Sequence, residues 1–552
     1  MSADPAHQAP AVARAPLPHD ATLPAMLAWL AAERGEQTCL LDGDAATSFG
    51  RLDERSRRLA AGLEALGVQR GDVVAVWLPN TTAWVELEFA TARLGALVLS
   101  VNTKLRSHDV QQLLHESQAK VLALWPAFRG IDFLGMLEQV AAEVPPSLQH
   151  LLLGGDAVPS DAVPAPLAAR AHAYEELVEA APSERSAASP ELPSNAFASS
   201  GTTSAPKLVL QTQDALVRHA HAVADAFGYR DADTVVLGML PFCGVFGFNT
   251  LAAAMAAGRP LVVQAAFDAD HAVDLVERHR VTHTNGADEM LLRILASASP
   301  VDRLASLREA GFASFGGDPQ ALVAQGEALG KRLFQTYGSS EVQALMCYPA
   351  PGAGVDRRSV GGGVPVSPEI SVRIRDLTTG SLVADGGEGE IEIAGPNVTV
   401  GYLRQGRAST DSHSEDGYFR TGDLGRLTPG PDLVYLSRLG DALRLGGFLV
   451  GPREIEGYLE SLPGVATAQV VGVQGDEGAV AVAFVVGDGS HELSEDELVG
   501  RCREDLARFK VPRRVLVVDA FPTTRSANGD KVQRVRLREM ATEALAEGQE
   551  DR

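Results

Sequence analysis

Short apolar runs alternate along the chain with longer segments whose apolar positions recur every three or four residues. Residues 72–79 (DVVAVWLP) and 97–101 (LVLSV) are typical of buried strands, and residues 83–96 between them have the period of a helix. Strands that are interleaved with helices form parallel sheets covered on both faces. The pattern therefore predicts a βα-layered sheet in the first part of the chain.

The same alternation returns in the middle of the chain. Apolar runs at 234–240, 280–285 and 332–338 predict strands, and residues 288–297 (DEMLLRILAS) have the period of a helix. The segment between 154 and 195 is rich in Ala, Pro and Ser and is typical of a connection. We therefore expect a second parallel layer after this connection.

Beyond about residue 360 the pattern changes to short alternating strands with frequent glycine, such as 369–376 (EISVRIRD) and 389–395 (GEIEIAG). Short alternating strands with frequent glycine are typical of a small antiparallel or barrel-like subdomain. After residue 438 a helical segment at 453–462, strands and a second helix follow, the latter introduced by the capping box Ser494-x-x-Glu497. The last segment therefore looks like a separate α+β unit.

Together these patterns predict an α/β protein of two domains. We expect a disordered, Ala/Pro-rich terminus at 1–20, an N-terminal domain at 21–437 with two βα-layered sheets plus a small β-barrel-like subdomain, and a small mobile α+β C-terminal domain at 438–552. A chain of 552 residues exceeds the size at which one hydrophobic core usually divides.

Composition narrows the function classes. The net charge of −23 disfavours an extended nucleic-acid surface, so any cationic function must be local. The four cysteines lie far apart without a C-x-x-C pair, which argues against zinc sites and a disulfide framework. No signal-like start and no apolar run long enough for a bilayer is present in the sequence. We expect a cytoplasmic protein with no transmembrane segment.

The segment from Ser199 to Lys207 (SSGTTSAPK) combines hydroxyls, a flexible glycine and a cation. Backbone N–H groups around Gly201, the neighbouring hydroxyls and the lysine can all donate to phosphate oxygens. The alternative is an exposed linker, which such composition often forms. It is not a Walker loop, because Leu208 follows the lysine where Ser or Thr would be needed.

Two further short motifs carry chemistry. Residues 337–341 (YGSSE) follow a predicted strand, and their aromatic ring, hydroxyls and carboxylate suit a purine, a phosphate and Mg²⁺; the alternative is an ordinary turn with a packed tyrosine. Residues 417–423 (GYFRTGD) place a carboxylate in a glycine-flanked turn, suited to two ribose hydroxyls, although such aspartates often bond only their own backbone.

In this order the motifs resemble those of the adenylate-forming superfamily, which includes acyl-CoA synthetases, aryl-CoA ligases, adenylation domains and luciferases. The phosphate loop at 199–207, the YGSSE segment at 337–341 and the YFRTGD segment at 418–423 match the family's patterns. Residues 438–457 resemble its hinge motif, and the segment around Lys531 resembles its last motif. The resemblance covers nearly the whole chain after about residue 40.

The resemblance implies an ATP-dependent ligase that uses ATP, Mg²⁺ and CoA. Lys531 would be the catalytic lysine and Thr202 would contact the phosphates, Glu341 would hold Mg²⁺, and the hinge would lie at Asp441. Gly446 and Gly447 would line the CoA channel, for which a tight β-turn is the alternative. The nucleotide-binding residues that the resemblance implies are Ser199, Ser200, Gly201, Thr202, Thr203, Lys207, Gly317, Asp318, Tyr337, Gly338, Ser340, Asp423 and Arg438. Lys531 belongs to a basic cluster, most of which is interpreted as a solvated face: Arg525, Lys531, Arg534, Arg536 and Arg538.

The implied acyl pocket consists of Phe242, Gly244, Phe246, Phe248 and Gly316. Gly244 replaces a usual histidine of the family and widens the acyl entrance. No aspartate follows Phe242, which disfavours an amino-acid substrate. Asp288 either recognises a polar group on the acid or caps a helix. Ser204 replaces a usual glycine and would carry roughly 1 to 3 kcal/mol of strain if its φ is positive.

We therefore expect an enzyme that activates a hydrophobic acid, fatty or aryl, as an acyl-adenylate and then forms its CoA thioester. Three alternatives remain open: transfer to the phosphopantetheine of a carrier protein, luciferase-like oxidation, and a non-catalytic acyl- or nucleotide-binding relative. Nucleic acid is not expected as a partner, and a homodimer stays open.

Overall fold

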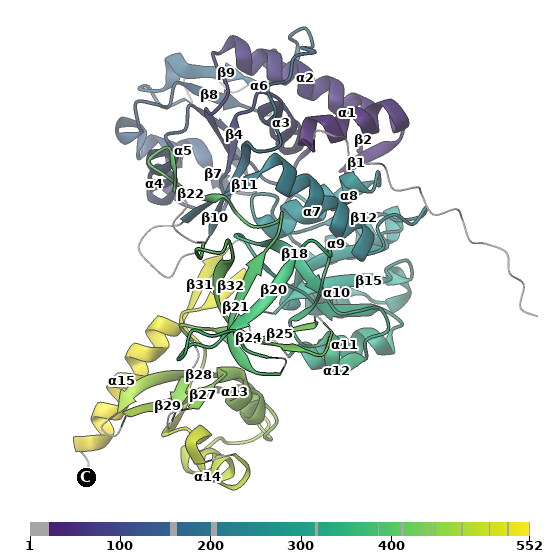
Figure 1. Ribbon diagram of the computed structural model, residues 1–552. Helices are drawn as coiled ribbons and strands as arrows, with labels where there is room; N and C mark the ends of the chain where they lie inside the picture. Colours follow the sequence, from purple (N-terminus) through teal and green to yellow (C-terminus); the bar gives the residue numbers. More distant parts are fainter. Residues whose placement is uncertain are drawn as a thin grey trace, which may run out of the picture.

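The computed structural model describes residues 21–154, 163–199, 207–314, 318–384, 386–409, 413–430, 432–441, 443–445, 448–475, 478–506, 508–526 and 529–550. Within these residues the chain forms two βα-layered sheets, one antiparallel sheet and a smaller C-terminal unit (Figure 1). The predicted α/β class with a large first domain is thereby confirmed.

The first sheet has nine strands in the described residues. Their order is β23 (Arg407–Ser409), β22 (Gly401–Arg404), β11 (Lys207–Thr212), β10 (Pro193–Ser199), β4 (Leu97–Ser100), β3 (Val73–Trp77), β5 (Val121–Leu124), β8 (His150–Leu153) and β9 (Ala171–Ala173). The strands from β10 to β9 pair in parallel, whereas β10, β11, β22 and β23 pair antiparallel. The phosphate-loop segment connects β10 to β11.

The second sheet is parallel except at its β1–β2 end. Its order is β16 (Arg332–Gln335), β15 (Glu309–Ala313), β14 (His283–Ala287), β12 (Val236–Gly238), β13 (Leu261–Val263), β1 (Thr38–Asp42) and β2 (Ala45–Ser48). The strand expected at 280–285 begins later than predicted, because Arg280 ends the preceding helix in a left-handed conformation with φ of 52°. Tertiary pairing, not local propensity, sets this boundary.

A helical layer separates the two sheets. It consists of α1 (Leu23–Arg34), α2 (Phe49–Ala65), α3 (Thr82–Arg93), α6 (Tyr174–Val178), α7 (Gln213–Ala226) and α8 (Val245–Ala256). The side chains of strand β3 are apolar on both faces of the first sheet. Val74 and Val76 face the helical layer, while Val73, Ala75 and Trp77 face the core on the other side. Such a strand, apolar on both faces, can only lie inside a parallel sheet.

Each sheet is also covered on its outer face. The helices α4 (Ser107–Ser117) and α5 (Phe133–Glu138) cover the first sheet, and α9 (Ala269–His279), α10 (Asp288–Ser297) and α11 (Pro319–Ala328), with α12 (Val355–Arg358) packed against α11, cover the second. Helix α10 has the bounds that the sequence predicted.

The short alternating strands that the sequence predicts after residue 360 belong to an antiparallel sheet. Its strands are β17 (Tyr337–Ser339), β18 (Gln343–Tyr348), β19 (Gly362–Pro365), β25 (Asp432–Arg438), β24 (Phe419–Thr428), β21 (Glu388–Ala394) and β20 (Ser371–Arg375), in this order. All pairs are antiparallel, and in the described residues the order is open at β17 and β20. This sheet carries two of the predicted nucleotide motifs.

The C-terminal unit has hydrophobic clusters of its own, composed of residues between Leu443 and Ala541. Its elements are β26 (Leu443–Leu445), β27 (Phe448–Val450), α13 (Pro452–Glu460), β28 (Val465–Gly475), β29 (Gly478–Gly487), α14 (Glu495–Asp505), β30 (Arg514–Val517), β31 (Thr523–Ser526), β32 (Gly529–Val532) and α15 (Arg534–Glu550). Ser494 precedes α14 as predicted, but its side chain makes no capping hydrogen bond, so the capping box was wrong. The exact domain boundaries stay a prediction.

Candidate active site

The carboxylate of Asp423 lies at the centre of a cluster in the antiparallel sheet. Asp423 on β24 pairs with Arg438 on β25, and an Arg438 Nη1 lies 3.1 Å from Asp423 Oδ1. From the start of β17, the Tyr337 hydroxyl donates a hydrogen bond to Asp423 Oδ2 at 2.7 Å. The sequence placed these three residues at the nucleotide, and the fold brings them together although 101 positions separate the first from the last.

Asp423 is buried, with 3% of its surface exposed. Burial raises the pKa of its carboxyl to about 6, against the opposing effect of Arg438. Within the described residues its Oδ1 accepts no hydrogen bond, and the neighbouring Arg438 Nη1 donates to the carbonyl of Thr421 at 3.0 Å. A buried carboxylate oxygen with acceptor capacity left over is suited to a ligand hydroxyl.

The Tyr337 ring is also buried and lies 5.5 Å from the ring of Tyr435, tilted by 33°. Burial raises the pKa of Tyr337 well above its usual value, so the hydroxyl stays protonated as the donor to Asp423. That this ring covers adenine stays a prediction.

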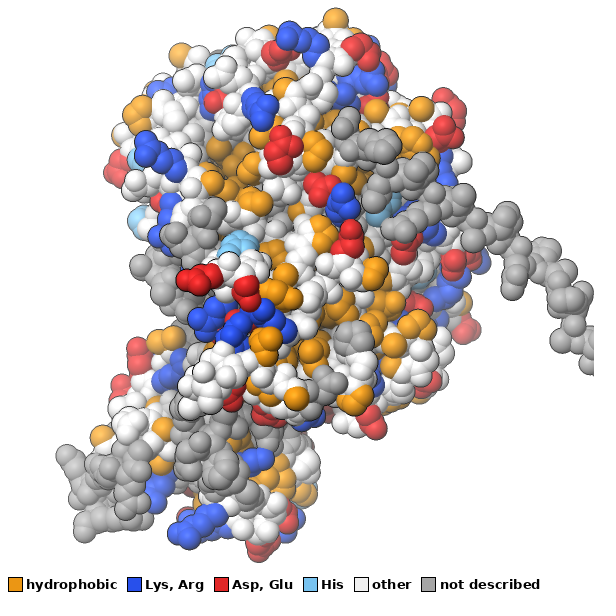
Figure 2. All heavy atoms as spheres, viewed as in Figure 1, with side chains coloured by type: hydrophobic (Ala, Val, Ile, Leu, Met, Phe, Trp, Pro, Cys, Tyr) orange, Lys and Arg blue, Asp and Glu red, His pale blue; other side chains and the backbone are white. Residues whose placement is uncertain are grey.

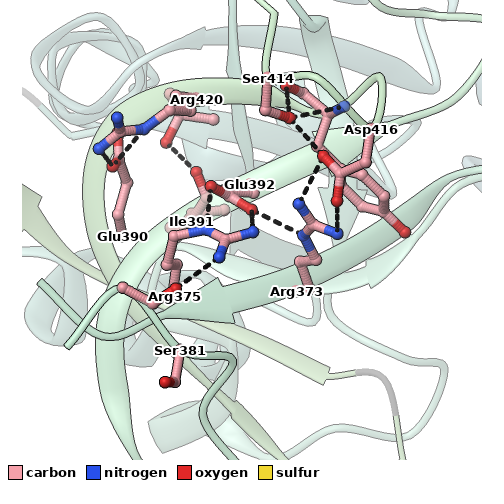
Figure 3. Close-up of polar contacts among 12 residues, drawn as sticks. Arg373, Arg375, Ser381, Glu390, Ile391, Glu392, Ser414, Asp416 and Arg420 are labelled. Atoms are coloured by element: carbon pink, nitrogen blue, oxygen red, sulfur yellow. Dashed lines mark hydrogen bonds and ion pairs between the residues drawn. The ribbon is translucent and has the colours of Figure 1, made fainter.

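A network of arginines and carboxylates joins the strands β20, β21 and β24, the last of which also carries Asp423 (Figure 3). Arg373 and Arg375 both bond the fully buried Glu392, at 2.6 Å each, and Arg420 bonds Glu390 at 2.9 Å. Glu390 also accepts a hydrogen bond from the backbone N–H of Gly422, at 3.2 Å. The network therefore fixes the turn that precedes Asp423.

Figure 2 shows basic side chains gathered on one face of the molecule, with acidic side chains beside them. In the network of Figure 3, Asp416 adds a further carboxylate that bonds Arg373 at 2.6 Å. Because each of these arginines is already paired with a carboxylate, we interpret the network as stabilising the sheet and not as an anion-binding site.

The carboxylate of Glu341 is partly exposed and lies close to the predicted phosphate loop. It accepts a hydrogen bond from the Tyr402 hydroxyl at 3.3 Å, and the Lys207 Nζ lies 5.3 Å from the centre of the same tyrosine ring. Tyr402 on β22 thus contacts both the predicted metal ligand and the predicted phosphate-binding lysine. Tyr402 could not be predicted from the sequence, because its contact depends on the pairing of β22 with β11.

The backbone of the YGSSE segment is held from β11. The Gln211 side chain donates to the carbonyl of Ser340 at 2.9 Å and to that of Glu341 at 3.4 Å. Gly338 must be glycine, because a Cβ there would lie 2.4 Å from the carbonyl oxygen of Gln343. Gln343 and Leu345 have a positive φ of 62°, a strained conformation that is concentrated at functional sites.

Several predicted residues lie outside the described residues: Ser200, Gly201, Thr202, Thr203, Ser204, Gly316, Gly317, Gly446 and Gly447. The structure does describe the two ends of the phosphate loop, where the backbones of Ser199 and Lys207 pair with each other. Asp318 is exposed and caps α11, since its Oδ1 accepts from the N–H of Gln320 at 2.9 Å.

The predicted acyl residues lie at the start of α8. Gly244 is the residue before the helix, and Phe242 and Phe248 pack at 5.6 and 6.2 Å from the ring of Trp84. Phe246 is also buried. Their aromatic side chains belong to the core between the sheets, and their contribution to an acyl pocket stays a prediction.

The C-terminal unit holds Lys531 on β32, whose backbone pairs with Thr524 of β31. In Figure 1 this hairpin rises from the C-terminal unit toward the body of the molecule. That Lys531 reaches the nucleotide site from the C-terminal unit stays a prediction.

Asp441, the predicted hinge residue, is bonded to α15. Arg538 donates to Asp441 Oδ1 at 2.6 Å and to the carbonyl of Gly440 at 2.7 Å. Arg534 donates to Glu456 at 2.7 Å. Arg534 and Arg538 therefore join elements of the C-terminal unit, whereas Arg536 of the same cluster is exposed.

The comparisons with known proteins agree with this arrangement. Residues 27–403 match the family described as AMP-binding enzyme, and residues 454–528 match the AMP-binding enzyme C-terminal domain. The chain therefore belongs to the AMP-binding enzymes of the adenylate-forming superfamily, as its motifs predicted.

Two relatives are similar in sequence to this chain over most of their length. The chain is 31% identical over 505 residues to 2-hydroxy-7-methoxy-5-methyl-1-naphthoate–CoA ligase of Streptomyces carzinostaticus, covering 90% of this chain and 89% of the relative. It is 32% identical over 534 residues to the 3-[(3aS,4S,7aS)-7a-methyl-1,5-dioxo-octahydro-1H-inden-4-yl]propanoyl:CoA ligase of Rhodococcus jostii, covering 94% and 98%.

Among solved structures, the chain is similar to ATP-bound MatB from Rhodopseudomonas palustris. The TM-score is 0.79 at 25% identity, and the match covers 95% of this chain and 100% of that one.

In the described residues, no helix is long and apolar enough to cross a membrane.

Proposed function

We propose that this chain is an ATP-dependent acid–thiol ligase that makes an acyl-adenylate and then an acyl-CoA thioester. The observation that carries the proposal is the acceptor site at Asp423, which Tyr337 and Arg438 hold in a buried position. Both relatives are named as CoA ligases, which favours CoA over a carrier-bound thiol as the acceptor.

In the first half-reaction, a carboxylate oxygen of the acid attacks the α-phosphorus of ATP. The bond from this phosphorus to the bridging oxygen breaks, and pyrophosphate leaves with the electron pair. Both reactants are anionic, so the site has to supply cations and aligned donors rather than a strong base. Lys207 at the end of the phosphate loop and Lys531 on the β31–β32 hairpin are the cations proposed for this task.

Asp423 binds the ribose in this proposal. Its Oδ1 accepts a hydrogen bond from a ribose hydroxyl, while the Tyr337 hydroxyl bonds Oδ2 and prevents the carboxylate from turning. Arg438 keeps the carboxylate ionised in spite of its burial. The remaining nucleotide contacts are proposed from the family resemblance: Ser199, Ser200, Gly201, Thr202, Thr203, Gly317, Asp318, Gly338 and Ser340.

Glu341 is the proposed ligand of Mg²⁺, which would neutralise phosphate charge when bound. The carboxylate of Glu341 fits this role, since a hard cation prefers carboxylate oxygens. It is partly exposed, and Tyr402, which bonds it, also contacts Lys207. Tyr402 would orient the carboxylate from one side, and Gln211 would hold its backbone.

In the second half-reaction, the thiol sulfur of CoA attacks the acyl carbon and the bond to the AMP oxygen breaks. The lysine that served the first step then stands in the way of the thiol, so the C-terminal unit has to turn. The proposed pivot is Asp441, and Gly446 with Gly447 would line the channel. ATP and CoA as substrates also support a cytoplasmic location; a homodimer stays a proposal.

For the acid, we propose a hydrophobic molecule that carries a ring. The two relatives are named for a naphthoate and for a propanoate attached to a fused bicycle. The proposed pocket residues are Phe242, Gly244, Phe246, Phe248 and Gly316. A straight-chain fatty acid is the alternative.

Pyrophosphate release over a panel of aryl, alicyclic, fatty and amino acids, with and without CoA, tests the proposal. We expect release with ring-bearing acids and thioester formation only when CoA is added. Release with no acid in the panel would support a non-catalytic relative, and release without a CoA thioester would support another acceptor.

A further inference from the structure

The turn between β17 and β18, residues 340–342, is held through its backbone carbonyls. The carbonyl of Glu341 accepts a hydrogen bond from the N–H of Thr399 at 2.6 Å. The carbonyl of Val342 accepts one from the side-chain amide of Asn397, also at 2.6 Å. Both donors belong to the connection between β21 and β22, so the turn that carries Glu341 is bonded to a segment remote in the sequence.

The strand after this turn begins in a strained conformation. Gln343 and Leu345 both have a φ of 62°, in the left-handed region that residues with a side chain rarely adopt. Between them the backbone lies close to β17, because a Cβ on Gly338 would be 2.8 Å from the Cα of Ala344. Such a conformation persists only where the surrounding groups hold it. The groups that hold residues 343–345 therefore also set the distance between β17 and β18.

Three buried side-chain bonds join this strained segment to the helical layer. His219 on α7 has its Nε2 2.6 Å from the carbonyl oxygen of Ala344, and the amide of Asn249 on α8 donates to the same oxygen at 2.9 Å. The amide of Gln343 donates to the carbonyl of Ala215 on α7 at 2.9 Å. His219 and Asn249 are each only 2% exposed. The start of β18 is therefore bonded to both helices.

His219 serves this segment as a neutral donor. Burial lowers the pKa of its imidazole to about 4, so the ring carries a proton on one nitrogen only. The carbonyl of Ala344 accepts, which assigns this proton to Nε2. In the described residues Nδ1 has no hydrogen-bond partner. The ring thus acts through a single N–H, and substitutions can test the two nitrogens separately.

We propose that His219 and Asn249 are positioning residues for the nucleotide site. Their shared bond to the carbonyl of Ala344 holds the strained start of β18 and thereby fixes the turn that carries Glu341. This inference rests on the proposed function, in which the segment 337–341 supplies contacts to ATP and Mg²⁺. It goes beyond that function by assigning the support of the segment to two side chains that touch no substrate.

The experiment compares His219→Gln with His219→Asn in the full chain. The amide nitrogen of Gln is as many bonds from Cβ as the imidazole Nε2, whereas that of Asn is as many bonds from Cβ as Nδ1. Both variants replace the buried ring by an amide and should lower the melting temperature, but only Gln can donate to Ala344. The measurements are kcat/KM for ATP in pyrophosphate release and the hydrogen exchange of the backbone amides in 337–348.

His219→Gln should keep kcat/KM for ATP within about threefold of wild type, because the bond to the carbonyl is retained. His219→Asn should lower it about 10- to 100-fold, because a displacement of about 1 Å caused far from the reacting atoms can cost about 100-fold. It should also speed amide exchange in 337–348. Asn249→Leu removes the second donor with a side chain of similar shape and should behave like His219→Asn.

Gln213→Leu is the matched control on the same helix. The buried side chain of Gln213 accepts from the N–H of Leu23 at 2.9 Å and donates to the carbonyl of Ala92 at 3.0 Å, in α1 and α3. Its loss should also lower the melting temperature. It should leave kcat/KM for ATP and the exchange in 337–348 unchanged.

Equal values of kcat/KM for ATP in His219→Gln and His219→Asn would overturn the inference. A loss in Gln213→Leu as large as that in His219→Asn would assign the effect to stability alone and would overturn it as well. Absence of pyrophosphate release by the wild type with every acid would remove the proposed function. The exchange in 337–348 would even then test whether His219 holds the strand.

Discussion

Replacing Asp423 by Asn should weaken nucleotide binding and at the same time stabilise the free protein. The pKa of this buried carboxyl is raised from 3.8 to about 6, which corresponds to about 3 kcal/mol at 1.36 kcal/mol per pH unit. The folded state binds the proton more tightly than the unfolded state. Ionisation of Asp423 therefore lowers the free energy of unfolding as the pH rises from about 4 through 6. Above that range the whole reduction applies.

Asn keeps an acceptor for the Tyr337 hydroxyl but carries no charge. It should therefore lose the charge-assisted bond to the ribose, worth about 1.5 to 3 kcal/mol, or a factor of roughly 10 to 150 in Kd. Without nucleotide, the variant should be more stable than wild type at pH 8, by up to about 3 kcal/mol, and equal to it near pH 4.

Calorimetric titration with AMP at pH 8, together with denaturant unfolding from pH 4 to 8, measures both effects. Glu388→Gln, at an exposed carboxylate on β21, is the matched control and should change neither quantity beyond about 0.5 kcal/mol. Unaltered AMP affinity in Asp423→Asn would refute the ribose assignment. A variant that is less stable than wild type at pH 8 would refute the assumed penalty of burial.

Other predictions concern the cations, the tyrosine and the hinge. Lys531→Ala should abolish adenylate formation but spare thioester formation from supplied acyl-adenylate, measured as separate half-reactions; equal loss of both would contradict a turning C-terminal unit. Tyr402→Phe should lower kcat/KM for ATP about 3- to 10-fold, because its bond to Glu341 is long and partly exposed, and the loss should shrink as Mg²⁺ is raised. No change at limiting Mg²⁺ would reject the positioning role. Arg538→Ala should alter the ratio of the two half-reactions through Asp441, and an unchanged ratio would exclude that contact from the hinge.

The sequence was informative where a feature is local. The period of residues 288–297 predicted α10 correctly, and the continuous apolar run at 72–79 correctly predicted a buried strand. It was uninformative where a contact joins distant segments. Tyr402 reaches Glu341 only because β22 pairs with β11, and no periodicity encodes that pairing.

For the candidate site, too, one part was predicted correctly from the sequence and another was not. The order of the motifs predicted that Tyr337, Asp423 and Arg438 act together, and the structure brings them into contact. Asp288 was interpreted as a helix cap because an aspartate before a helical pattern usually is one. The helix begins one residue earlier than that interpretation requires, which leaves the carboxylate buried beside Ser314 instead.

The two hydrophobic clusters of the C-terminal unit have a mechanical consequence. Among the described residues, their buried members come from the segment between Leu443 and Ala541, so the interior of this unit would move with it in the proposed rotation about Asp441. The rotation would then expose little apolar interior, and the proposed alternation between the two half-reactions would not require partial unfolding.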